Sequence, residues 1–335
     1  MLDMAAEATG TGWEALADRA LRGEPPSRTE ALAVLRAPDE ELLQLLGAAY
    51  RVRRATFGKK VKLNLLMNAK SGVCPEDCGY CSQSIVSTAA IPTYSLLEED
   101  VIVEGAREAW RRKAGTYCIV ASGRGPSARE LRGVTAAVRK IKAELPMKVC
   151  ACLGLLTDEQ AAALREAGVD RYNHNLNTSA DHYGRITTTH TYEDRVRTLE
   201  AVKRAGISPC SGVITGMRET DEQLVDVAFA LRELDADSIP VNFLHPIDGT
   251  PLEGVRELDP RHCLKVLCLF RFVCPTKEIR VSGGREVNLR SLQPLSLLPA
   301  NAIFIGDYLT TPGQAAEDDY RMIEDLGLEI EECAL

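Results

Sequence analysis

The sequence predicts an α/β protein built as a TIM-type (β/α)8 barrel. From Lys60 onward, short runs of β-forming residues alternate with longer amphipathic segments, and roughly eight such units fit into about 250 residues. Gly115, Gly168 and Gly206 each stand where a helix should end just before the next strand, a position that glycine favours. Such barrels carry their functional groups at the C-terminal ends of the strands.

The expected elements follow one another along the chain. Strand and helix pairs are expected at 61–67 and 98–114, 117–121 and 128–145, 148–153 and 158–167, 171–176 and 192–205, 208–214 and 221–234, and 238–244 and 260–273, followed by strands at 278–281 and 302–305. Residues 1–58 are expected to form an N-terminal helical extension, because leucines recur at helical spacing between an acidic start and a basic end. Residues 59–310 would form the barrel, and 311–335 a closing helix and tail.

The composition limits the partners and the compartment. The 335 residues include 48 acidic and 40 basic ones, a formal net charge of −8 at pH 7. Without a basic surplus to displace counterions, a nucleic-acid partner is not expected. The N-terminal residues lack the basic start and apolar core of a secretory signal, and no apolar run is long enough to span a membrane. We therefore expect a cytoplasmic protein whose eleven cysteines are ligands or reactive thiols rather than disulfides.

Three cysteines, Cys74, Cys78 and Cys81, crowd into the loop after the first expected strand. A structural zinc site needs four nitrogen or sulfur ligands, and no histidine or fourth cysteine lies nearby. Three thiolates suit an iron–sulfur cluster that leaves one iron open to a substrate. Zinc with a distant fourth ligand and buried inert thiols are the alternatives, and so many thiols in a polar loop disfavour the second.

Polar side chains are also expected inside the barrel. Because successive strand residues alternate between faces, Asn173, Asn175 and Asn177 should share one side and His174 the other. A parallel strand between a barrel interior and helices has no solvent face. Three inward amides would suit a polar, uncharged ligand, whereas His174 is expected to be a packed, hydrogen-bonded residue.

A second set of thiols lies on other expected strands. Cys118, Cys210 and either Cys150 or Cys152, which share a face, would converge with Arg280 if all point inward. A single buried cysteine usually acts as a small apolar residue. Three thiols beside a buried arginine that needs an anionic partner instead favour a second metal–sulfur site.

The motifs together resemble a known family. The spacing C-x3-C-x2-C, with Tyr80 before the last cysteine, resembles the signature of radical S-adenosylmethionine (SAM) enzymes. The chain also resembles the biotin synthase family in CPEDCGYCSQ at 74–83, YNHNL at 172–176, CSG at 210–212, GTPL at 249–252, SGGRE at 282–286 and LTTP at 309–312. The resemblance covers the chain from about residue 60 to its end, and YNHNL with the second cysteine set is its discriminating part.

The resemblance implies a sulfurtransferase that converts dethiobiotin to biotin by radical sulfur insertion. A [4Fe–4S] cluster on Cys74, Cys78 and Cys81 would bind SAM and cleave it to a 5′-deoxyadenosyl radical, and a [2Fe–2S] cluster would supply sulfur. The residues implied for the second cluster are Cys118, Cys150, Cys210 and Arg280. Those implied for SAM are Tyr80, Asn175, Asn177, Arg195, Gly212, Ile214 and Gly216. Those implied for dethiobiotin are Asn173, Asn175, Asn242, Thr310 and Thr311.

The resemblance also implies a homodimer and an electron donor such as flavodoxin or ferredoxin, and it needs no general acid or base. Two positions depart from the pattern. Asn177 replaces an aspartate, which would weaken a contact to the SAM ribose, and Ser122-Gly123-Arg124 replaces a Gly-Gly-Glu type of stretch.

Four further cysteines are expected to be structural or incidental: Cys263, Cys268, Cys274 and Cys333. The alternatives to this function are another radical SAM maturase or mutase with a similar barrel, and a non-catalytic iron–sulfur protein.

Overall fold

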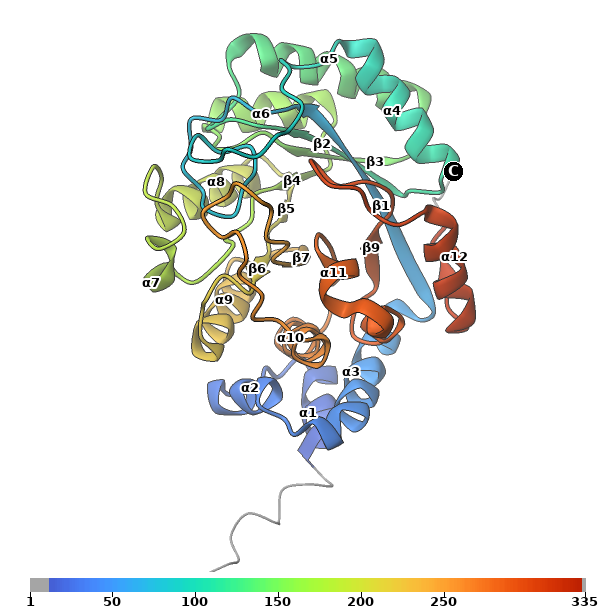
Figure 1. The fold of residues 1–335 in the computed structure, drawn as a ribbon. Coiled ribbons are helices and arrows are strands. Elements are labelled where there is room, and N and C mark those ends of the chain that lie inside the picture. Colours follow the sequence, from blue (N-terminus) through green and yellow to red (C-terminus); the bar gives the residue numbers. More distant parts are fainter. Residues whose placement is uncertain (1–11, 333–335) are drawn as a thin grey trace, which may run out of the picture.

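The computed structural model describes residues 12–332, in which a ring of parallel strands is surrounded by helices (Figure 1). Eight strand positions close the barrel, because β1 pairs with β2 on one side and with β9 on the other. The strands are β1 (Lys60–Lys70), β2 (Thr116–Ala121), β3 (Lys148–Cys152), β4 (Arg171–Asn173), β5 (Ser208–Cys210), β6 (Val213–Thr215), β7 (Ser238–Phe243), β8 (Glu278–Val281) and β9 (Ala302–Phe304). The predicted TIM-type barrel is confirmed.

The outer helices follow the predicted order. They are α4 (Glu99–Arg111), α5 (Ala128–Glu144), α6 (Asp158–Ala167), α8 (Tyr192–Arg204), α9 (Asp221–Glu233) and α10 (Pro260–Val273). Four of them begin with a capping box, in which a Ser or Thr and the third helical residue bond each other's backbone N–H. Three short helices, α7 (Ala180–Tyr183), α11 (Arg285–Leu289) and the 3-10 helix η2 (Arg290–Leu297), were not predicted.

The N-terminal helices pack against α10 at one end of the barrel (Figure 1). They are α1 (Gly12–Leu21), α2 (Arg28–Leu35), the 3-10 helix η1 (Asp39–Glu41) and α3 (Leu42–Phe57). Arg53 of α3 is fully buried, and its guanidinium donates to the carbonyl oxygens of Lys60 at 2.7 Å and Ala300 at 3.3 Å. These carbonyls precede or begin β9 and β1, so Arg53 ties the extension to the starts of these two strands.

The C-terminal residues lie beside the same end of β1. Helix α12 (Ala316–Asp325) is followed by β10 (Glu329–Ile330), which pairs in parallel with the first two residues of β1. Of the four cysteines expected to be structural, Cys263, Cys268 and Cys274 are buried on or beside α10, whereas Cys333 lies outside the described residues.

Two predicted strands are shorter than expected. β4 ends at Asn173, and the predicted strand 208–214 is divided into β5 and β6, which both pair with β7. At the division, a Cβ on Gly212 would lie 1.9 Å from the carbonyl oxygen of Pro240, so the chain can approach β7 only without a side chain. Asn177 has φ +69°, outside extended geometry. Strand alternation therefore does not apply from His174 to Asn177.

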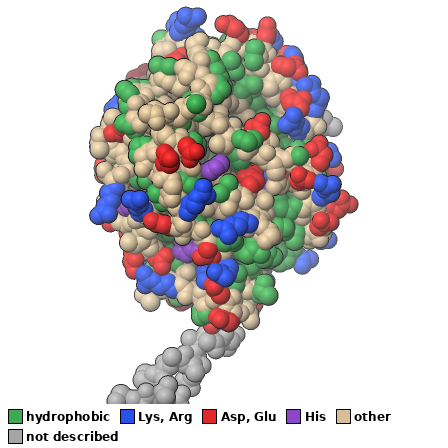
Figure 2. Space-filling view, viewed as in Figure 1, with side chains coloured by type: hydrophobic (Ala, Val, Ile, Leu, Met, Phe, Trp, Pro, Cys, Tyr) green, Lys and Arg blue, Asp and Glu red, His purple; other side chains and the backbone are tan. Residues whose placement is uncertain are grey.

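The surface carries mixed charges. On the face in Figure 2, acidic and basic side chains are intermingled rather than gathered in one basic patch. Within residues 12–332, no helix is long and apolar enough to cross a membrane.

Replacing Gly212 with alanine is expected to lower the free energy of unfolding by about 1–3 kcal/mol, because the added methyl overpacks the junction with β7. Urea unfolding followed by circular dichroism measures the effect. Gly184→Ala is the control, since no atom lies within 4 Å of a Cβ at this position and its φ is −65°. Equal unfolding free energies for the two variants would contradict the prediction.

Candidate active site

One cavity of about 400 Å³ opens among the loops at the C-terminal ends of the strands. It brings together most of the residues singled out in the sequence: Cys74, Cys78, Tyr80, Cys81, Cys118, Cys150, Cys152, Asn173, Asn175, Asn177, Arg195, Ile214, Asn242, Arg280, Thr310 and Thr311. Cys210 lies just behind the wall. Gly212 and Gly216 are not among the described residues that line the cavity. The prediction that His174 faces away is wrong, because β4 ends before it and the residue is part of the cavity lining. The expected hydrogen bonding is also wrong for its Nε2, which is buried without a partner among the described residues.

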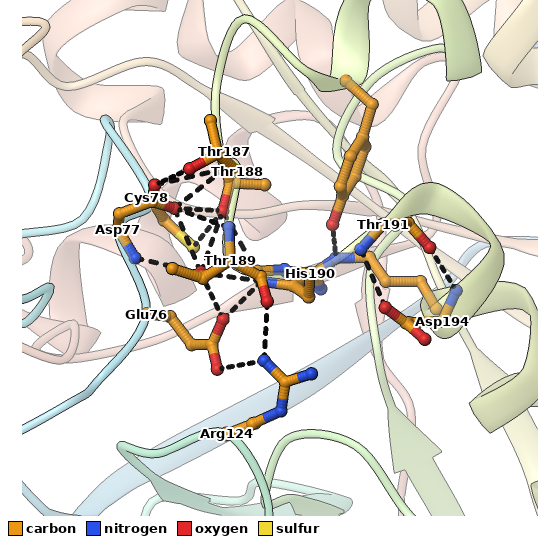
Figure 3. A network of polar contacts seen from close by, with 12 residues as sticks. Glu76, Asp77, Cys78, Arg124, Thr187, Thr188, Thr189, His190, Thr191 and Asp194 are labelled. Atoms are coloured by element: carbon orange, nitrogen blue, oxygen red, sulfur yellow. Dashed lines mark hydrogen bonds and ion pairs between the residues drawn. The ribbon is translucent and has the colours of Figure 1, made fainter.

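The three-cysteine loop is held in place through Asp77. The Asp77 carboxylate accepts hydrogen bonds from the backbone N of Thr188 at 2.9 Å, the backbone N of Thr189 at 3.2 Å and Oγ1 of Thr187 at 2.6 Å (Figure 3). Burial raises the pKa of Asp77, but the hydrogen bonds from Thr187 and Thr188 outweigh it and leave the pKa well below its usual value. The segment 187–189 therefore holds the loop through hydrogen bonds to Asp77, which lies between two of its cysteines.

The thiols of this loop fit a cluster better than a single ion. Burial raises the pKa of Cys81 to about 12 and also raises the pKa of Cys78, so a cation bound there would have to offset the cost of ionising them. Among residues 12–332, no three His, Cys, Asp or Glu side chains converge closely enough to hold one metal ion. Thiols that each bind a different iron of one cluster have no need to converge on a point.

The second set of thiols meets inside the barrel. Cys118 and Cys150 are neighbours in the β2–β3 register, and the Cys150 thiol interacts with those of both Cys118 and Cys210, so that the pKa values of the three are linked. The interaction with Cys150 lowers the pKa of Cys210 against the effect of burial, assisted by the charges of Arg280 and Arg171. The convergence predicted from strand alternation is confirmed.

The geometry decides between the two cysteines of β3. Cys150 contacts both other thiols, whereas Cys152 lines the cavity farther along the strand, opposite Val120. Burial raises the pKa of Cys152 to about 12, and the thiols of Cys118 and Cys210 influence it only through charge. Cys150 is therefore the member of the convergent set.

Arg280 completes this second set from β8. Its Nη2 donates to the Sγ of Cys210 at 2.9 Å and to the Oγ of Ser238 at 3.0 Å, and its Nη1 donates to the Oδ1 of Asn64 at 3.2 Å. Its Nε is buried and has no hydrogen-bond partner in the described part of the chain. Because an unsatisfied buried donor is costly, the site fits an electron-rich group such as a sulfide-bearing cluster beside the three thiols.

A series of polar contacts connects the three-cysteine loop to Arg195, and the sequence analysis did not predict it. The Nη2 of Arg195 lies 2.8 Å from the Nε2 of His190. The Nδ1 of His190 lies 2.6 Å from the Oε2 of Glu76 (Figure 3). Arginine can only donate, so Nε2 of His190 accepts and its Nδ1–H donates to Glu76. Burial and the charge of Arg195 lower the pKa of His190, in keeping with a neutral ring. Glu76 adjoins Asp77 in the sequence, which was the available signal.

The amides of the site are largely paired with each other or with the backbone. Asn177 Nδ2 donates to the hydroxyl of Tyr80 at 2.6 Å, and Asn173 Nδ2 donates to Oδ1 of Asn175 at 3.0 Å. Asn242 donates to the carbonyl oxygen of Val213 and accepts from Gly283 N, both at 3.0 Å. Asn242 therefore fixes the ends of three strands as well as lining the cavity.

Comparisons with known proteins agree with this site. Residues 69–231 match the radical SAM superfamily, and residues 240–329 match the Biotin and Thiamin Synthesis associated domain. The chain is 65% identical over 319 residues to a biotin synthase of Geobacillus thermodenitrificans, which covers 95% of this chain and 96% of the relative. It is 63% identical over 323 residues to a biotin synthase of Bacillus pumilus, which covers 96% and 98%.

Solved structures share the fold. Methylornithine synthase superposes with a TM-score of 0.83 at 21% identity, covering 95% of this chain and 98% of that one. The [FeFe]-hydrogenase maturase HydG superposes with a TM-score of 0.82 at 15% identity, covering 98% and 78%. At these identities the likeness concerns the barrel alone.

Asp77→Ala is expected to speed hydrogen exchange at the backbone amides of Thr188 and Thr189 by about tenfold or more, because hydrogen bonds to a charged group each contribute about 1.5–3 kcal/mol. Exchange measured by mass spectrometry on peptides spanning 185–191 checks this. Asp100→Ala is the control, since its side chain is 86% exposed and pairs with Lys140 instead. Unchanged exchange in the Asp77 variant would show that the hydrogen bonds to Asp77 do not hold the segment 187–189 in place.

Proposed function

This chain belongs to the biotin synthase family of the radical SAM superfamily, and on that premise we propose that its cavity binds dethiobiotin between two iron–sulfur clusters. Members of the family are sulfurtransferases that use SAM, a [4Fe–4S] cluster and a [2Fe–2S] cluster to convert dethiobiotin to biotin. When bound, the first cluster supplies the electron that cleaves SAM, and the second supplies the sulfur.

The observation that carries the proposal is that two thiol sets meet at one cavity, which all but Cys210 line. Cys74, Cys78 and Cys81 would hold the first cluster in the loop after β1. Cys118, Cys150, Cys210 and Arg280 would hold the second cluster deeper in the barrel. A non-catalytic iron–sulfur carrier has no need of a polar cavity between two such sets of thiols. Another maturase or mutase has no need of the deeper set of thiols.

Arg195 would orient SAM. Its guanidinium has five N–H donors, of which three are engaged by the Tyr183 hydroxyl, the Asn175 carbonyl oxygen and His190. Two donors remain, and a planar fork of this kind suits a carboxylate such as that of the SAM methionine. Tyr80, Asn175, Asn177 and Ile214 lie on the same cavity wall and would contact the rest of SAM.

The remaining lining would hold dethiobiotin and exclude water. The amides of Asn173 and Asn175 face the cavity and suit a neutral ureido ring, with Asn242 beyond them. Thr310 and Thr311 follow β9, also line the cavity, and would donate to the substrate carboxylate. Because an alkyl radical reacts with almost any neighbour, the chief task of these residues is positioning within an enclosed space.

The direct test is anaerobic turnover. The reconstituted full-length chain, given SAM, a strong reductant and dethiobiotin, should release 5′-deoxyadenosine and form biotin, detected by mass. Release of 5′-deoxyadenosine without any biotin, with both clusters present, would overturn the assignment of dethiobiotin as substrate.

The oligomeric state and the reductant follow from the family resemblance. A homodimer is proposed, and light scattering of the purified chain tests it. Flavodoxin or ferredoxin is proposed as the electron donor. The outer side of the three-cysteine loop supports access by such a protein, because the side chains of Val73 and Ile85 are exposed.

Cys150→Ala is expected to remove the iron and acid-labile sulfide of the second cluster while leaving those of the first, because this thiol contacts both other members of the set. Cys152→Ala on the same strand is the matched control and should retain both clusters. Iron and sulfide analysis with visible spectra of the reconstituted proteins measures the difference. Loss of the second cluster only in the Cys152 variant would reverse the assignment.

A further inference from the structure

A buried ionic layer lies in the barrel beneath the second set of thiols. The Glu278 carboxylate on β8 is 5% exposed and accepts a hydrogen bond from the Nζ of Lys62 on β1 at 3.0 Å. Nη1 of Arg171 on β4 lies 2.8 Å from both of its oxygens. Sequence reasoning assigned no role to these three residues, and none of them lines the cavity among the described residues.

The strand register places this layer next to the proposed ligands. Glu278 precedes Arg280 by two residues, and Lys62 precedes Asn64 by two, so each pair shares the inward face of its strand. Arg171 is the register partner of Cys150. Small barrels usually fill such a layer with branched aliphatic side chains, and buried ion pairs are generally no more stabilising than apolar packing. Stability therefore does not explain why charged side chains occupy this layer.

One branch of the layer reaches Arg280 through a serine. The hydroxyl of Ser238 donates to Oε1 of Glu278 at 2.8 Å, so only its lone pairs remain for the Nη2 of Arg280, at 3.0 Å. The same Nη2 donates to the Sγ of Cys210. Glu278 thus sets the direction of the Ser238 hydroxyl, and that hydroxyl helps to fix the guanidinium against the thiol.

The layer also places positive charge beside the thiols. Lys62, Arg171 and Arg280 face a single buried carboxylate, that of Glu278, which leaves two positive charges in excess. The other charged groups facing the layer are the partly exposed Glu331, 3.7 Å from Lys62, and Lys148, whose opposite charges offset each other. Such charges are weakly screened in a barrel interior and favour an electron-rich neighbour.

We propose that Lys62, Arg171 and Glu278 are positioning residues for the second cluster, which orient Arg280 through Ser238 and raise the reduction potential of the cluster by their net positive charge. The proposal rests on the proposed function, because it concerns the cluster that Cys118, Cys150 and Cys210 would hold. It assigns to the three residues no contact with substrate.

Two charge-removing variants test the electrostatic part. Lys62→Gln removes a positive charge, so the midpoint potential of the second cluster should fall, and Glu278→Gln removes the negative charge, so it should rise. The measurement is an anaerobic titration of the visible absorbance of the reconstituted protein without SAM or dethiobiotin. Lys265→Gln is the control, because this lysine is also mostly buried but pairs with Asp39 on the outside of α10.

Opposite shifts in the two variants cannot arise from general loosening of the site, which would move both in one direction. Equal potentials in Lys62→Gln, Glu278→Gln and the unaltered protein, with full iron and sulfide content, would overturn the proposal. If Glu278→Gln loses the second cluster, the midpoint potential of Lys62→Gln is compared with that of Lys265→Gln, and a fall only in Lys62→Gln supports the proposal. Absence of any second-cluster signal in the unaltered protein would instead overturn the proposed function.

The positioning part is tested by replacing the acceptor itself. Glu278→Ala leaves Ser238 without its acceptor and should change the visible circular dichroism of the second cluster, whereas Glu278→Gln keeps an amide oxygen for Ser238 and should restore the spectrum. An unaltered spectrum in Glu278→Ala would show that Arg280 is held without Glu278. Loss of the cluster in Glu278→Ala with retention in Glu278→Gln would support the same role.

Discussion

The hydrogen bond between Arg280 and the thiol of Cys210 joins β8 to β5, the two strands on either side of β7, and the arrangement of the site depends on it. A guanidinium in that position must have acceptors and packing on every side. Asn64 and Ser238 supply acceptors, and Phe304 packs against one face with its ring centroid 4.7 Å from the guanidinium carbon. The deep half of the cavity is thereby fixed before any cofactor enters, which suits a site that must hold a cluster in one orientation.

A barrel with so polar an interior needs a well-closed lower end. Arg53 and Arg271 lie at that end, fully buried and without a carboxylate partner among residues 12–332, and burial lowers their pKa values to about 10 and about 9. Backbone carbonyl oxygens act as acceptors in place of carboxylates, including those of Pro299 and Pro275 for Arg271. Because these carbonyls belong to the turns that lead into the strands, the two arginines hold the N-terminal helices, α10 and the strand starts together.

The sequence was informative where the backbone is regular. Cys118 and Cys150 lie within full strands, so alternation of side chains was enough to place them in one interior. The same rule failed at His174, because β4 ends one residue earlier and the positive φ of Asn177 redirects the chain. The pairing of Glu76 with His190 and that of Glu278 with Arg171 could not be found, since each joins residues more than 100 positions apart and local pattern carries no record of such pairs.

The two halves of the site are also tied to each other. The hydroxyls of Ser82 beside the three-cysteine loop and Thr310 after β9 lie 2.8 Å apart. The segment that carries Thr310 is anchored in turn, because the Tyr308 hydroxyl donates to Glu286, and Arg285 next to it pairs with the buried Asp319 of α12. A substrate carboxylate bound at Thr310 would therefore meet a residue already in contact with the loop of the first cluster. With Thr310 in its proposed role, this contact would link substrate binding to the loop proposed to hold the first cluster, so that a radical would form where its target lies within reach.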